Sequence, residues 1–143
     1  MNSSIVIGAS GLIAHAWHWS YLRHSAPQLN GRFERLNSRR MESNDWAAWI
    51  AIKSISESIM RVNSNKNKKI LDYIKTDSLQ IDGSKGISLN YRKLTNQLRQ
   101  TILLTSSNNW VTAKIPLQDF QNSDNNLDTI GIPIKDTKCV KGD

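Results

Sequence analysis

The chain has 143 residues but only one cysteine, three prolines and no long apolar run. Because a single cysteine cannot form an internal disulfide, we expect Cys139 to be a free thiol near the end of the chain. No stretch approaches the roughly 20 apolar residues of a membrane-spanning helix, so we expect a protein that does not cross the membrane. The P-loop, the GxGxxG fingerprint and the GxSxG nucleophile motif are also absent.

Positive charge, by contrast, is abundant. The 19 Lys and Arg exceed the 12 Asp and Glu, which gives a net charge of +7. Nine of the 19 Lys and Arg lie in two stretches, 32–40 and 61–75, and Asn and Ser punctuate both. We interpret these stretches as solvated helix faces and expect no nucleic-acid partner. A small nucleic-acid-binding protein built on the net charge is an alternative hypothesis, and it predicts binding that collapses with added salt.

The first half of the chain predicts one strand and then helices. Residues 5–7 (IVI) are a β-branched run closed by GASG, which predicts a buried strand entering a loop. This segment has no basic region before its apolar run, so a strand fits better than an export signal. The pattern turns helical over 18–36. Pro27 interrupts it, and we expect this proline in the first turn of a second helical segment, 28–36.

The segment Trp46 to Val62 gives the strongest helix signal in the chain. Ser43 or Asn44 can cap its start, and Asp45 is favourable in the first turn because its negative charge is attracted by the positive end of the helix dipole. The first turns, WAAWIAI, are apolar all round, so we expect the first half of the helix to be buried on every side. Beyond these turns the apolar surface continues as a single stripe at helical spacing, which consists of Ile52, Ile55 and Ile59.

Strands replace helices in the second half. A short amphipathic helix is predicted over 68–76, and alternating apolar residues between 79 and 115 predict a β-meander of two or three strands. The chain is thus expected to be α/β, in the order strand, helices, β-meander, with one domain over 1–117 and an extended tail over 118–143. Few strands and an all-round-apolar helix indicate a piece of a larger fold, whose burial partners lie elsewhere.

Residues that can carry chemistry gather near the start. His15 and His18 are three apart, a spacing that would place two metal ligands on one helix face. A small metal-dependent enzyme is therefore a second alternative, although this spacing more often reflects polar residues on a loop and a helix start. Trp17 and Trp19 follow a strand and a glycine-containing loop, where ligands usually sit in α/β folds. Trp17 and His18 are thus expected to line a cleft, whereas core packing is favoured for Trp49.

Several longer runs are familiar when they are read in order. They are GLIAHAWHWSYLRHSAPQLNGRF, MESNDWAAWIAIKSISESIMR, KGISLNYRKLTNQLRQTILL and LDTIG, with Cys139 near the end. Together they resemble the substrate-binding protein of the ABC transporter type associated with PQQ-dependent alcohol dehydrogenase systems. This family belongs to the type I periplasmic binding proteins. The resemblance covers most of the chain and corresponds to the C-terminal part of longer, exported members, so it implies a partial two-lobe fold.

The resemblance implies binding without bond chemistry, and hence no catalytic residue, metal or cofactor. Two lobes would close on a small-molecule ligand in the periplasm, and the closed form would dock on an ABC permease in the inner membrane. The residues carried over as ligand-binding are Trp17, His18, Asp45 and Trp46. Residues 93–95 (KLT) depart from the family pattern, which usually has an aromatic or Pro-Trp pair there.

Overall fold

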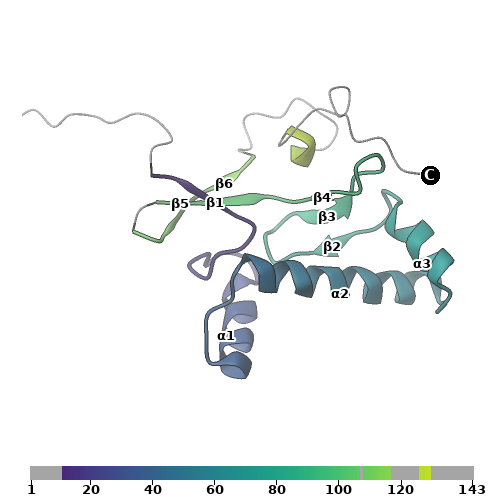
Figure 1. The fold of residues 1–143 in the computed structure, drawn as a ribbon, viewed down its shortest axis with the longest axis horizontal. Helices are drawn as coiled ribbons and strands as arrows, with labels where there is room; N and C mark the ends of the chain where they lie inside the picture. The colour runs from purple at the N-terminus through teal and green to yellow at the C-terminus, as the bar shows by residue number, and fades with distance from the viewer. Residues whose placement is uncertain (1–10, 107, 117–125, 130–143) are drawn as a thin grey trace, which may run out of the picture.

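The structure is a computed structural model that describes residues 11–106, 108–116 and 126–129 (Figure 1). The strand predicted over 5–7 and the thiol of Cys139 lie outside these ranges. The helices are α1 (Ala26–Asn37), α2 (Ser43–Val62), α3 (Asn67–Ile74) and the short 3-10 helix η1 (Asn126–Thr129). The strands are β1 (Ile13–His15), β2 (Ile81–Asp82), β3 (Ser88–Tyr91), β4 (Leu98–Arg99), β5 (Ile102–Thr105) and β6 (Val111–Ile115).

The strands form two small antiparallel sheets, in the orders β1-β5-β6 and β2-β3-β4. In the first sheet Ala14 pairs with Leu104, and in the second Ile81 pairs with Leu89. β4 and β5 follow each other closely along the chain, so one extended segment leaves the second sheet and enters the first (Figure 1). The protein is therefore mixed α/β. The β-meander of two or three strands predicted between 79 and 115 was too small, because this stretch carries five short strands, β2 to β6.

The helix starts agree in part with the sequence. Pro27 lies in the first turn of α1, as predicted, but the helical pattern expected to begin at residue 18 forms turns and bends instead. α2 begins a few residues earlier than predicted. Its N-cap is Glu42, and Asp45 closes a capping box by accepting a hydrogen bond from the Glu42 backbone at 2.9 Å. The predicted end at Val62 is confirmed.

The expectation that α2 is buried on every side at its start is wrong. Its buried face consists of Trp46, Ile50, Ser54 and Ser58. The hydroxyls of both serines donate to carbonyls four residues earlier at 2.7 Å, so this polar part of the face is satisfied within the helix. The predicted apolar stripe points to solvent instead, and Ile52 is 66% exposed. The reason is that α2 packs against the β2-β3-β4 sheet and against α3 (Figure 1), and neither of these covers the Ile52 side of the helix.

Two tryptophans predicted as ligand-binding lie at the centre of the core. Trp17 and Trp46 are each 1% exposed, and their rings stack with centroids 6.0 Å apart and planes 7° from parallel. Leu89 and Leu103 bring one strand of each sheet into the same cluster. The stack joins the segment after β1 to α2, so it fixes where the start of α2 sits. The remaining members are Tyr21, Ala26, Met41, Ile50, Leu79, Ile81 and Leu127.

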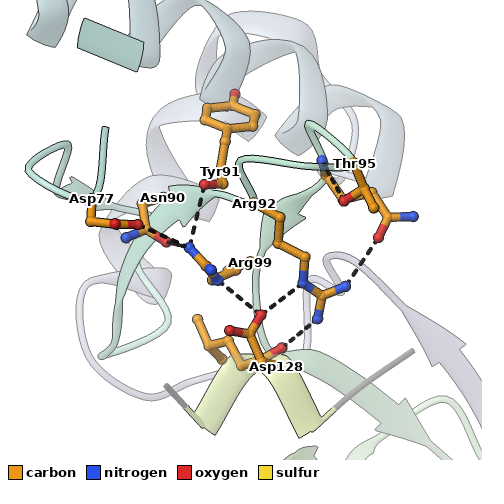
Figure 2. Close-up of polar contacts among 9 residues, drawn as sticks. Asp77, Asn90, Tyr91, Arg92, Thr95, Arg99 and Asp128 are labelled. Carbon is orange, nitrogen blue, oxygen red and sulfur yellow. Dashed lines mark hydrogen bonds and ion pairs between the residues drawn. The ribbon is translucent and has the colours of Figure 1, made fainter. Parts of the chain in front are cut away.

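A network of charges attaches η1 to the second sheet (Figure 2). Asp128 Oδ1 accepts from Nε of Arg92 at 2.8 Å and from Nε of Arg99 at 2.9 Å. Burial raises the pKa of Asp128, but the hydrogen bonds and charges of the two guanidinium groups outweigh it, so the pKa lies below 3.8. Leu127 beside it is 2% exposed in the core. Residues 126–129 of the predicted extended tail thus form a packed turn, and the rest of 118–143 lies outside the described ranges.

Candidate functional site

A cleft of about 410 Å³ opens where the segment after β1 meets the start of α2. The turn before β6 completes its rim, so the walls come from three segments that lie far apart in sequence. Its lining residues are His15, Trp17, His18, Trp19, Met41, Glu42, Ser43, Asn44 and Asn109. A larger hollow runs along α1, but all of its lining residues come from that one helix, so no second element of the described residues encloses it. The cleft is therefore the better candidate site.

The hydroxyl of Ser43 anchors one wall of the cleft to the other. Ser43 Oγ accepts from the Trp17 backbone N–H at 3.2 Å and donates to the Trp17 carbonyl at 3.1 Å. The Trp17 indole Nε1 donates to Asn30 of α1 at 2.9 Å. Trp17 therefore lines the cleft, as predicted from its place in the sequence, but its ring is buried and fully engaged. It acts as a support for the wall rather than as an exposed contact surface.

His15 and His18 lie side by side in the cleft, with ring centroids 5.1 Å apart. The pairing does not come from a shared helix face, because His15 ends β1 and His18 sits in the turn that follows. His15 Nε2 contacts Thr105 Oγ1 of the neighbouring strand at 3.2 Å. Across the described ranges, no group of three His, Cys, Asp or Glu side chains is placed to hold a metal ion.

The protonation state of His18 follows from its contacts. Burial, and then the nearby charges of His15 and Arg40, lower the pKa of His18 below 6.5, so the ring is neutral at pH 7. Its Nδ1 accepts from the Ser20 backbone N–H at 3.3 Å and lies 2.8 Å from Ser20 Oγ. A neutral ring that accepts at Nδ1 carries its proton on Nε2. The network therefore assigns His18 Nε2–H as a donor that a ligand can meet.

Trp19 supplies the aromatic surface of the cleft, a role that sequence reasoning did not assign to it. Its ring lies 5.8 Å from that of Trp110, and the Arg40 guanidinium sits 3.6 Å above the Trp19 ring centroid. Such a cation over an indole face is attracted by the ring quadrupole. Arg40 belongs to a stretch interpreted as a solvated helix face, but its contact with Trp19 brings a fixed positive charge to the edge of the cleft.

Asp45 and Trp46, the other two predicted site residues, do not line the cleft. Asp45 forms an ion pair with Arg39 at 2.6 Å, and hydrogen bonds from Arg39 and from the Glu42 backbone lower the pKa of Asp45 to about 2. Trp46 is buried, and its indole Nε1 donates to the Gly83 carbonyl at 3.0 Å. Both residues thus have structural contacts that hold α2 in place.

Asn44 and Asn109 are cleft residues that the sequence did not reveal. The sequence pattern placed Asn44 near the start of α2, but it predicted a helix-capping role for this residue and not a place in the cleft. Asn109 lies in the turn before β6 with a φ of 62°, a left-handed conformation that asparagine tolerates well. It reaches the cleft only because β6 pairs with β5 and β5 with β1. No signal in the sequence connects it with the histidines.

No family model, curated protein or solved structure matches this chain. In the part of the chain that the structure describes, no helix combines the length and apolarity needed to cross a bilayer.

Proposed function

We propose that the protein is the solute-binding component of an ABC import system linked to PQQ-dependent alcohol oxidation, and that its ligand binds in the cleft. The observation that carries the proposal is the composition of the cleft. An indole face, a neutral histidine donor and two amide side chains converge from three segments of the chain. Concave sites with an aromatic wall and a few placed polar groups are typical of small-molecule binding.

The cleft favours a small organic ligand that carries oxygen acceptors. His18 Nε2–H and the amide groups of Asn44 and Asn109 can donate to such oxygens, while Trp19 packs against a carbon skeleton. Its volume of about 410 Å³ lies near the lower end of the 300–1,000 Å³ usual for pockets that hold drug-sized molecules. An aldehyde or carboxylate formed by oxidation of an alcohol fits this chemistry.

A two-lobe mechanism agrees with the position of the cleft at the surface. In this proposal a second lobe closes over the ligand, and the ligand shifts the population toward the closed state because it contacts both lobes only there. The exposed stripe of α2 offers an apolar surface on which further parts of such a fold would pack. The closed form would then dock on the permease.

A fluorescence titration tests the ligand site. Short-chain alcohols, aldehydes and carboxylates would be added separately to the 143-residue chain, with tryptophan emission as the signal. We expect saturable quenching by at least one compound class, since Trp19 lines the cleft and its ring contacts that of Trp110. His18→Asn should weaken that binding about tenfold, because asparagine can retain the Ser20 contact but lacks the Nε2 donor.

The matched control is His24→Asn. His24 is exposed, lies outside the cleft and has a φ of 56°, which asparagine accepts. It should bind like the unmodified chain. Equal affinity of the two variants would show that the ligand does not use His18, and no saturable response to any of the three classes would reject the cleft as the solute site.

A further inference from the structure

A second, smaller pocket of about 240 Å³ lies between the turn that precedes α1 and strand β6. Its lining residues are Ser20, Tyr21, Leu22, Arg23, Val111, Thr112, Ala113 and Lys114. None of these residues lines the cleft described above. The two hollows are neighbours through Ser20, whose hydroxyl contacts His18 and accepts from the Val111 backbone N–H at 3.0 Å.

Positive charge gathers at this pocket. Lys114 Nζ donates to the Lys85 backbone carbonyl at 3.0 Å, and the buried Lys85 side chain donates to Gln100 and to the Thr101 carbonyl. Burial and the charge of Arg23 lower the pKa of Lys114. Burial and the charge of Lys114 likewise lower the pKa of Lys85. Among the described residues, none of these three cations forms an ion pair with a carboxylate.

The pocket also contains a tyrosine with an unused polar group. Tyr21 is 4% exposed, and its hydroxyl has no hydrogen-bond partner among the described residues. Buried hydroxyls almost always have a partner, so an unsatisfied one calls for an explanation. Arg23 lies close enough to Tyr21 for its charge to act on the pKa of the hydroxyl, which burial raises. The phenol and the cations thus belong to one neighbourhood.

We propose that this pocket binds a small oxyanion, which the cations of Arg23 and Lys114 neutralise and the Tyr21 hydroxyl contacts as a further donor. An anion there would relieve the repulsion between like charges and would satisfy the tyrosine at the same time. The pocket is smaller than those that enclose drug-sized ligands, so it fits a single carboxylate or phosphate group. The site does not depend on the ligand proposed for the cleft.

Isothermal titration calorimetry with inorganic phosphate and, separately, with acetate tests the site and distinguishes the two anions. The 143-residue chain would be used at constant ionic strength, so that screening stays the same throughout. We expect saturable binding of at least one anion with a stoichiometry near one. Arg23→Gln and Lys114→Gln should each weaken it by about tenfold or more, as expected when a charge-assisted contact is lost. Tyr21→Phe should weaken it less, because only a neutral hydroxyl is removed.

Lys69→Gln is the matched control, since it removes the same charge from an exposed position on α3. It should bind the anion like the unmodified chain. Arg23 is exposed, so its variant should retain the fold even if Lys114→Gln disturbs the contact with Lys85. Failure of both anions to bind saturably, or equal weakening by Arg23→Gln and Lys69→Gln, would overturn the proposal.

Discussion

Lys85 makes the stability of this protein depend on pH in the alkaline range. Its side chain is 0% exposed, and its Nζ lies 3.8 Å above the Trp46 ring centroid. Burial, followed by the charge of Lys114, lowers the pKa of Lys85 from 10.5 to about 7. Between these two values the unfolded chain binds a proton that the folded chain does not, so the free energy of unfolding rises with pH across this window. Below pH 7 both states carry the proton, and the effect is constant.

The slope of this dependence can be stated. One proton of difference changes the free energy of unfolding by about 1.4 kcal/mol per pH unit, so two pH units inside the window give about 3 kcal/mol. Urea unfolding at pH 7.5 and pH 9.5, followed by tryptophan emission, measures this difference. Lys85→Met removes the titrating group while its side chain fills a similar volume, so the rise attributable to Lys85 should be absent in the variant.

Lys69→Met provides the comparison, because Lys69 is exposed and should leave the pH dependence unchanged. The quantity to compare is the slope of the free energy of unfolding against pH, taken as the difference between each variant and the unmodified chain. Lys85→Met will also alter the stability at every pH, since Gln100 and Thr101 lose a donor. Parallel pH profiles for the unmodified chain and Lys85→Met would refute the reasoning, since they would mean that Lys85 has the same pKa in both states.

Three further outcomes are expected from the packing and the charges. Trp46→Ala should lower the free energy of unfolding by about 3–5 kcal/mol, whereas Ile52→Ala should change it by less than about 0.5 kcal/mol. Urea titration measures both changes, and similar losses for the two variants would contradict the observed orientation of α2. Asp45→Ala should cost about 1 kcal/mol at neutral pH. The folded-state pKa of Asp45 is about 2, against 3.8 normally, so its contribution should vanish in thermal melts as pH falls through that interval. Asp128→Asn should lower the free energy of unfolding by about 1–3 kcal/mol in the same melts. A loss no larger than that caused by Asp72→Asn, at an exposed position, would show that the arginine network does not stabilise η1.

Local features of the helices could be predicted from the sequence because they depend on neighbours within a few residues. Pro27 in a first turn, the favourable position of Asp45 and the end of α2 at Val62 follow from dihedral preference, the helix dipole and periodicity. The closeness of Trp17 and His18 to a strand end was also readable, although the strand concerned is β1 rather than the run over 5–7. The sheets are antiparallel, so the loop rule for parallel α/β folds does not account for the cleft.

By itself, then, the sequence determined where α1, α2 and α3 form and that the first tryptophans and histidines share one short segment. Only the tertiary structure decided which face of α2 is buried, because Trp46 stacks on Trp17 and turns the Ile52 side of the helix outward. It also brought Asn109 to the cleft and enclosed Lys85, a residue that its sequence between Ser84 and Gly86 would place on a solvated turn. Periodicity records which residues share a face of an element, but contacts between distant segments determine which face meets water and which meets the core.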